Sequence, residues 1–264
     1  MSGAPRVSCL MVTLDRLPLL KEAVQCYCDQ SYQSRELVIV SDGTEWYRSA
    51  VKSYLSFLER DDIRLIEVTE RQTLGALRNR AVDEAAGDLL CQWDDDDLYH
   101  PDRLTLQVDR LLEQDAGACF MTDQLQFFQH DRTLYWIDWT GKTGLWQYIP
   151  GTMMARSDLD VRYPETGDEA RRGEDSAFLE KIVACHSVAA LSGEGYCYLY
   201  RFHGRNVFSH QHHHEIASTS SLSEPSLHQR MKQLQFSLSY YRLPAPYEIR
   251  ARGPEGACTY GGAP

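Results

Sequence analysis

Short apolar runs alternate with longer segments of helical periodicity over the first 93 residues. Residues 7–12 form a continuous apolar run, and residues 17–27 after it place apolar side chains three and four positions apart. A short continuous run is typical of a strand buried on both faces, whereas the second spacing predicts an amphipathic helix. We predict strands at 7–12, 37–40, 63–68 and 89–93, and helices at 17–27, 45–58 and 73–86. Such alternation favours a parallel sheet covered by helices on both faces.

Two local signals predict where helices begin and end. Asp15 precedes the segment 17–27, and its carboxylate could cap the first turn of that helix. Gly87 follows the segment 73–86, and glycine is common just beyond a helix end.

The second half of the chain is less regular. We expect strands at 118–122, 151–156, 188–191 and 196–202, and helices at 176–184 and 222–241. Residues 134–139 alternate in polarity, as in an antiparallel addition to a sheet. Residues 243–264 are rich in Pro and Gly and are expected to be poorly ordered unless docked. The simplest division is one domain over residues 1–242 and a Pro/Gly-rich tail over residues 243–264.

Composition restricts the classes of function. The 264 residues are 43% hydrophobic and 25% charged, with a net charge of −11, so attraction to nucleic acid or anionic lipid is not expected to be the main activity. No apolar run approaches the ~18 residues that a spanning helix needs. The eight cysteines are scattered and fit reduced thiols. We therefore expect a cytoplasmic protein without a transmembrane segment, and leave peripheral attachment to the inner membrane face open.

Polar side chains follow three of the predicted strands. Thr13 ends the first strand, Asp42 follows the second, and four aspartates, Asp94–Asp97, follow the fourth. Ligands of open α/β sheets bind beyond the carboxyl ends of the strands. These positions therefore predict one pocket.

The four adjacent aspartates predict a metal site. Their mutual repulsion is costly unless a cation shares the charge, and carboxylate oxygens suit Mg²⁺ or Mn²⁺. An EF-hand loop does not fit, because Tyr99 stands where its glycine would be and Thr105 replaces its bidentate glutamate. A solvated acidic turn is the structural alternative.

Aromatic residues are dense between positions 135 and 148. Most are expected in the core, although several could form a platform for the C–H face of a sugar ring. They are Tyr135, Trp136, Trp139, Trp146 and Tyr148.

Three segments carry a resemblance to a known family. They are VSCLMVTLDR, QSYQSRELVIVSDGT and GALRNRAVDEAAGDLLCQWDDDDLYHPDRL. In order and spacing the chain resembles the family 2 glycosyltransferases over about its first ~125 residues, with further similarity at 151–156 and 173–175. The resemblance implies a GT-A fold, a Rossmann-like mainly parallel sheet with flanking helices, and inverting transfer from a nucleotide sugar, with UDP-sugar as the expected donor.

The resemblance also assigns roles to the acidic residues. It implies that Asp42 binds the nucleobase, although Ser41 stands where the family commonly has another aspartate. It places metal and diphosphate binding on Asp94, Asp95 and Asp96, with Asp96 as the principal metal ligand, and gives Asp97 a structural role. Mn²⁺ or Mg²⁺ is the implied cofactor.

A later pair of carboxylates is the candidate for general-base catalysis. By resemblance Asp175 is the base, with Glu174 beside it. Attack by an acceptor hydroxyl needs such a base. The alternative is that both residues only favour a helix N-terminus.

Alternative roles are open for several other polar residues. Arg78 could reach the donor or form a structural salt bridge, and Thr13 could contact the base or ribose. The family often places a histidine near the metal, a role that His203 could take instead of packing. The histidines at 210 and 212–214 are expected in an exposed loop rather than at a metal.

These observations predict a metal-dependent glycosyltransferase with an unknown glycan, lipid or small-molecule acceptor. The alternatives are a noncatalytic relative that binds a sugar or a partner, and a sugar-phosphate nucleotidylyltransferase. The nucleotidylyltransferase is disfavoured because the segment after the first strand, MVTLDRLP, lacks the Gly- and Arg-rich loop of that class.

Overall fold

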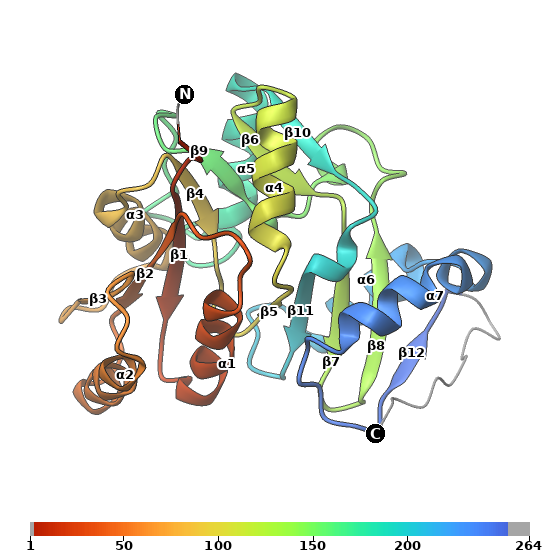
Figure 1. Cartoon of the computed structure of the whole chain (residues 1–264), viewed down its shortest axis with the longest axis horizontal. Coiled ribbons are helices and arrows are strands. Elements are labelled where there is room, and N and C mark those ends of the chain that lie inside the picture. Colours follow the sequence, from red (N-terminus) through yellow and green to blue (C-terminus); the bar gives the residue numbers. More distant parts are fainter. Residues whose placement is uncertain (1–2, 253–264) are drawn as a thin grey trace.

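The computed structural model describes residues 3–252, which form two β-sheets side by side (Figure 1). The first sheet has seven strands in the order β10-β6-β9-β4-β1-β2-β3. Their bounds are Val7–Thr13 (β1), Arg35–Ser41 (β2), Ile63–Glu67 (β3), Leu89–Gln92 (β4), Ala118–Met121 (β6), Met154–Arg156 (β9) and Val188–Leu191 (β10).

The first sheet is mainly parallel, as predicted. Strand β1 pairs in parallel with β2 and β4, with Cys9 opposite both Leu37 and Cys91. Only β9 runs against its neighbours β4 and β6. The ends of β1, β2 and β4 therefore lie at one edge.

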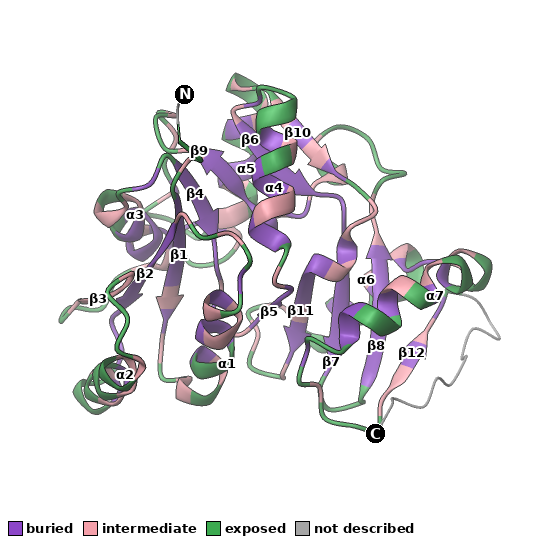
Figure 2. Cartoon of the chain, viewed as in Figure 1, coloured by how far each residue is buried: buried purple, intermediate pink, exposed green. Residues whose placement is uncertain are grey.

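Helices cover both faces of this sheet. Helices α1 (Leu17–Cys28), α2 (Glu45–Leu58) and α4 (Arg103–Glu113) share a hydrophobic core with one face. Helices α3 (Leu74–Glu84) and α5 (Glu174–Cys185) pack on the other. The strands are largely buried (Figure 2), which explains their uninterrupted apolar runs. The α/β fold class is confirmed.

The second sheet is mixed, in the order β12-β8-β7-β11-β5. The alternating segment is β8, which pairs antiparallel with β7 as expected. Helix α7 shares a core with one face of this sheet and helix α6 with the other. The bounds are Leu98–Tyr99 (β5), Asp123–Phe128 (β7), Thr133–Asp138 (β8), Tyr198–Phe202 (β11), Glu248–Arg250 (β12), His210–Ser220 (α6) and Glu224–Leu238 (α7), with short 3₁₀ turns at Gly144–Gln147 (η1), Pro150–Thr152 (η2) and Gly195–Cys197 (η3).

Both local helix signals are wrong. Arg16, not Asp15, occupies the N-cap of α1, and the Asp15 carboxylate instead accepts the backbone N–H of Thr44 at 3.2 Å, beside α2. Helix α3 ends at Glu84, and the next residue is already extended. Gly87 has a packing role, since a Cβ there would lie 2.7 Å from the carbonyl oxygen of Arg6.

Part of the segment 243–264 is docked. Its residues 248–250 form β12, which pairs in parallel with β8. Residues 253–264 lie outside the described part of the chain. Within residues 3–252 no helix has the length and apolar character needed to cross a membrane.

Candidate functional site

The sheet edge gathers the polar residues that follow β1, β2 and β4. Thr13, the last residue of β1, donates from its hydroxyl to Asp95 Oδ2 at 2.6 Å. Thr13 and Asp42 together line a pocket of about 480 Å³. The expected clustering of these strand ends is therefore present in the fold.

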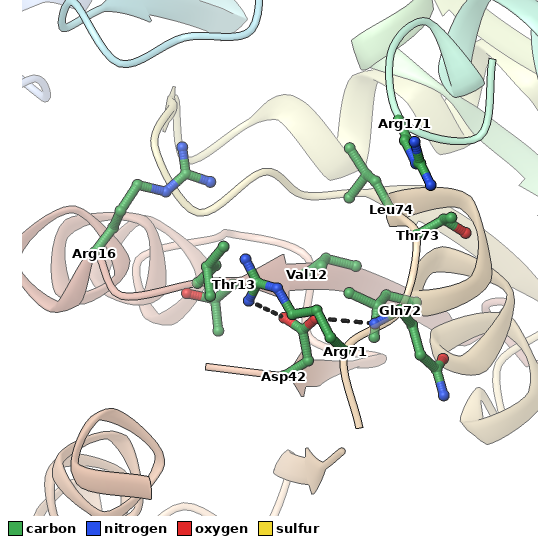
Figure 3. A pocket seen from close by; sticks show the side chains of 11 residues that line it. Val12, Thr13, Arg16, Asp42, Arg71, Gln72, Thr73, Leu74 and Arg171 are labelled. Atoms are coloured by element: carbon green, nitrogen blue, oxygen red, sulfur yellow. Dashed lines mark hydrogen bonds and ion pairs between the residues drawn. The ribbon is translucent and has the colours of Figure 1, made fainter. Parts of the chain in front are cut away.

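Asp42 lies in the wall of this first pocket (Figure 3). Its Oδ2 accepts the backbone N–H of Gln72 at 3.3 Å, and its Oδ1 lies 3.4 Å from the Arg71 guanidinium. Arg71 is 64% exposed, so water screens this ion pair and leaves it weak. Arg16 and Arg171 reach the pocket from the segments before α1 and α5. The pocket thus combines one buried carboxylate with three arginines.

Arginines share the charge of the acidic loop. Arg16 forms ion pairs with Asp95, at 2.5 Å, and with Asp96. Arg78 bridges Asp94 at 2.9 Å and Glu174 at 2.8 Å. Arg78 therefore forms the structural salt bridge considered above, and it does so at the site itself.

Compensation of the loop's charge is incomplete. Burial and the neighbouring charge of Asp96 raise the pKa of Asp95 to about 7, despite Arg16. Burial and the charges of Asp96 and Asp94 also raise the pKa of Asp97. Asp97 accepts the Tyr198 hydroxyl and the backbone N–H of Arg201 at 2.8 Å. These bonds tie the loop to β11, which is a structural role.

Asp96 and His203 form the pair suited to a metal ion. His203 Nε2 lies 3.0 Å from Asp96 Oδ2, and the His203 side chain is only 6% exposed. Burial opposes ionisation of Asp96, but the hydrogen bond from His203 and the charge of Arg16 outweigh it and lower the pKa of Asp96. Among residues 3–252 no three His, Cys, Asp or Glu side chains converge on one point. The pair therefore supplies two donors of a kind that Mn²⁺ accepts.

Glu174 and Asp175 open α5, as predicted. The preceding Gly173 has φ 87°, a left-handed conformation that favours glycine, and it turns the chain into the helix. Glu174 is buried against Arg78, whereas Asp175 is half-buried. Burial and the adjacent charge of Glu174 raise the pKa of Asp175 to about 6. A carboxylate tuned in this way is suited to accept a proton near neutral pH.

A second pocket, of about 180 Å³, joins these groups. It is lined by the whole acidic loop together with Glu174 and Asp175. Val12, Arg16 and Leu74 line both this pocket and the first, so the two pockets adjoin. The Asp42 carboxylate, the acidic loop and Asp175 therefore border two adjoining pockets.

The exposed-loop prediction for the histidine cluster is wrong. The four residues lie on helix α6, which Ser209 caps by accepting the backbone N–H of His212 at 3.3 Å. His213 is buried and stacks on Tyr200 with ring centroids 4.8 Å apart. Burial and the charges of His212 and His210 lower the pKa of His213 to about 4. His210 Nε2 contacts Asp131 Oδ2 at 2.9 Å.

Of the cations at the site, only Arg78 was among the residues predicted from the sequence. Arg16, Arg71 and Arg171 are absent from the predicted residues, although they line the first pocket. A signal existed for Arg16, because a run of four aspartates at a strand end needs positive charge from a neighbouring strand end. Arg71 and Arg171 lie in irregular segments, where spacing gives no such signal.

Comparisons with known proteins agree with this geometry. The model of the family described as Glycosyl transferase family 2 matches residues 8–163. EpsE of Bacillus subtilis, provisionally named a glycosyltransferase, is 32% identical over 109 residues, which cover 41% of this chain and 39% of EpsE. WcaA of Escherichia coli, provisionally named a colanic acid biosynthesis glycosyl transferase, is 31% identical over 107 residues, or 40% of this chain and 38% of WcaA. The chain thus matches well under half the length of both relatives.

Two solved structures show the same fold. TarS of S. aureus in complex with UDP-GlcNAc has a TM-score of 0.59 at 16% identity, and the match covers 90% of this chain and 68% of that one. The mannosyltransferase PcManGT of Pyrobaculum calidifontis, in complex with GDP-Man and Mn²⁺, has a TM-score of 0.57 at 18% identity, covering 80% of this chain and 60% of that one.

Proposed function

Since this chain belongs to the Glycosyl transferase family 2, we propose that it is an inverting glycosyltransferase that moves a sugar from a UDP-sugar donor to an acceptor hydroxyl. The observation that carries the proposal is the pair of adjoining pockets bordered by Asp42, the acidic loop and Asp175. Asp42 would serve the nucleobase, the acidic loop the diphosphate, and Asp175 the reacting hydroxyl.

Each of the three regions has a chemistry that fits its part of the donor. Asp42 is a buried acceptor that can take the N–H of a uracil imide. Arg16 lies between the first pocket and the acidic loop, where a guanidinium can pair with phosphate oxygens. The complexes of TarS with UDP-GlcNAc and of PcManGT with GDP-Man support a nucleotide-sugar donor.

Asp175 is the proposed general base. It takes the proton of the acceptor hydroxyl while the hydroxyl oxygen forms a bond to the anomeric carbon. The bond from that carbon to the diphosphate breaks, and the electron pair leaves with the nucleoside diphosphate. Attack from the side opposite the leaving group inverts the anomeric centre. Arg78 pairs with Glu174, and this holds the turn that carries Asp175.

The residues at the acidic loop fit a divalent ion. Mg²⁺ is usually bound by one or two carboxylates together with substrate phosphates, and Asp96 and His203 would hold Mn²⁺ or Mg²⁺ together with the donor diphosphate. Asp94, which pairs with Arg78, would have to exchange that partner to join them. The ion would supply neutralisation of charge on the departing diphosphate. The complex of PcManGT with Mn²⁺ supports this assignment.

We also propose a cytoplasmic setting. The seven cysteines within residues 3–252 are free thiols, a state that the cytosol maintains.

A panel of UDP-glucose, UDP-galactose, UDP-GlcNAc and GDP-mannose tests the function. We expect at least one UDP-sugar to raise the melting temperature in the presence of Mn²⁺, because a ligand that binds only the folded state stabilises it. The same donor should be hydrolysed slowly without an acceptor. Binding without any turnover would instead favour the noncatalytic alternative, and no binding at all would contradict the proposal.

A further inference from the structure

A third cavity, of about 570 Å³, opens from the reaction centre towards the second sheet. Asp94 and Asp175 line both this cavity and the pocket of the acidic loop. We refer to it as the acceptor-side cavity. Its volume lies within the range of about 300–1,000 Å³ typical of small-molecule sites, and its position places any occupant beside the candidate base.

One wall of the cavity is a polar face of β7. Side chains alternate along a strand, and in β7 Leu125 and Phe127 enter the hydrophobic core shared with α7. Gln124 and Gln126, on the other face, line the cavity. Both glutamines are buried, in a position where a simple packed sheet would carry apolar side chains. The strand therefore places neutral hydrogen-bonding groups in the cavity wall.

Three of these wall residues have an unsatisfied polar atom. Gln124 Oε1, Gln126 Oε1 and Trp139 Nε1 are buried and have no hydrogen-bond partner among the described residues. A buried polar group without a partner loses the hydrogen bonds that water would give it, which is unfavourable. Two acceptors and one donor in one cavity match the hydroxyl groups of a polyol, since each hydroxyl both donates and accepts.

Aromatic rings line the same cavity. Of the five aromatics noted in the sequence, Tyr135 and Trp136 are buried in the packing of the second sheet. Trp139, Trp146 and Tyr148 line the cavity instead. Trp146 lies on the short turn η1 and is 69% exposed, although a large apolar ring is normally covered. An exposed indole beside hydrogen-bonding amides is a surface on which the C–H face of a pyranose can stack.

We propose that the acceptor-side cavity binds a pyranose unit of a saccharide acceptor, stacked on Trp146 and hydrogen-bonded through Gln124, with one free hydroxyl directed to Asp175. This inference rests on the proposed glycosyl transfer and names its acceptor class. A lipid chain fits less well, because it would leave both glutamines and the Trp139 N–H unpaired in an apolar contact.

The test measures acceptor binding separately from donor binding. The probes are the methyl glycosides of glucose, galactose, mannose and N-acetylglucosamine, and 1-octanol serves as the lipid-like probe. Binding of each probe is measured by saturation-transfer NMR. UDP affinity in the presence of Mn²⁺ is measured by calorimetry. We expect at least one glycoside to bind, Trp146→Ala to weaken it about tenfold, and Gln124→Leu to weaken it by a similar factor. UDP affinity should not change in either variant.

Trp46→Ala is the matched control. Trp46 is 74% exposed on α2 and does not line the cavity, so its removal should leave glycoside binding unchanged. Octanol binding without glycoside binding would overturn the inference, as would glycoside affinity that is equal in the wild type, Trp146→Ala and Gln124→Leu. A failure of the proposed function would be seen separately, because the wild type would then not bind UDP. In that case a bound glycoside could not be an acceptor for glycosyl transfer.

Discussion

The donor side and the acceptor-side cavity differ in how their polar groups are satisfied. On the donor side, Arg16 pairs with Asp95 and Asp96, and Arg78 pairs with Asp94 and Glu174. The β7 wall of the acceptor-side cavity is neutral, and buried atoms of Gln124 and Gln126 have no partner among the described residues. Charged ligands such as a diphosphate need fixed counter-charges, whereas an uncharged sugar is recognised by hydrogen bonds and shape. Under the proposed function, the two substrates would therefore bind by different physical means.

Asp175 borders both regions, so its replacement should have the largest effect. Asp175→Asn keeps the side chain's size but cannot accept a proton at neutral pH, and transfer should fall by roughly 10²–10⁴-fold. Donor affinity should stay unchanged, because the groups that contact the donor are intact. Steady-state transfer kinetics and UDP calorimetry measure the two quantities.

The matched control for that variant is Glu169→Gln, an exposed carboxylate in the segment before α5. It should transfer normally. A circular-dichroism melt confirms that each variant folds. Normal turnover by folded Asp175→Asn would limit Asp175 to stabilising the helix N-terminus.

Asp96→Ala should affect the donor side alone. Without Asp96 the metal ion that would offset negative charge on the departing diphosphate is lost, so transfer should fall by about 10²–10³-fold. Nucleotide binding should then no longer depend on Mn²⁺. Glycoside binding in the acceptor-side cavity should remain. The control is Asp61→Ala, at an exposed acidic position after α2. If nucleotide affinity in Asp96→Ala still responded to Mn²⁺, the metal would lie elsewhere.

Asp42→Ala should have a smaller effect, confined to the nucleobase. Loss of a hydrogen bond to a charged group costs about 1.5–3 kcal/mol, so UDP affinity should fall about 10- to 100-fold. Inorganic diphosphate should bind as before. Equal losses for both ligands in calorimetry would show that Asp42 does not contact the base.

The pH profile should show the smallest but most specific effect. As the proposed base, Asp175 would act only when deprotonated. Since its surroundings raise its pKa to about 6, kcat/KM should fall tenfold per pH unit below that value. Glu174→Gln removes the adjacent negative charge, which lowers the pKa of Asp175. The acidic side of the kcat/KM profile should therefore move to lower pH. If it moved to higher pH or did not move, the ionisation would belong to another group.

Much of the first sheet could be predicted because most of its strands are short apolar runs that are followed by polar residues. Thr13, Asp42 and the acidic loop could be placed at one edge from that pattern alone. The second sheet was harder, because its strand β7 carries glutamines at alternate positions, and a strand that faces a polar cavity lacks the apolar signal. Helix α6 was missed since its histidines suggested a loop. Burial of His213 and Ala217 in the structure shows which face is inside.

The two helix-end errors have the same cause. Asp15 and Gly87 satisfy local rules, but a tertiary contact decides each position: Thr44 for Asp15 and the backbone of Arg6 for Gly87. The ion pairs of Arg16 and Arg78 also join residues that are far apart in sequence, and such pairs are not visible in spacing.

The most direct test of the account is a crystal structure of the protein with UDP and Mn²⁺. The account predicts the uracil beside Asp42, the diphosphate at the acidic loop, and the metal in contact with Asp96 and His203, while the acceptor-side cavity stays free of nucleotide. A nucleotide bound in the acceptor-side cavity, or a diphosphate away from Asp94–Asp97, would contradict it.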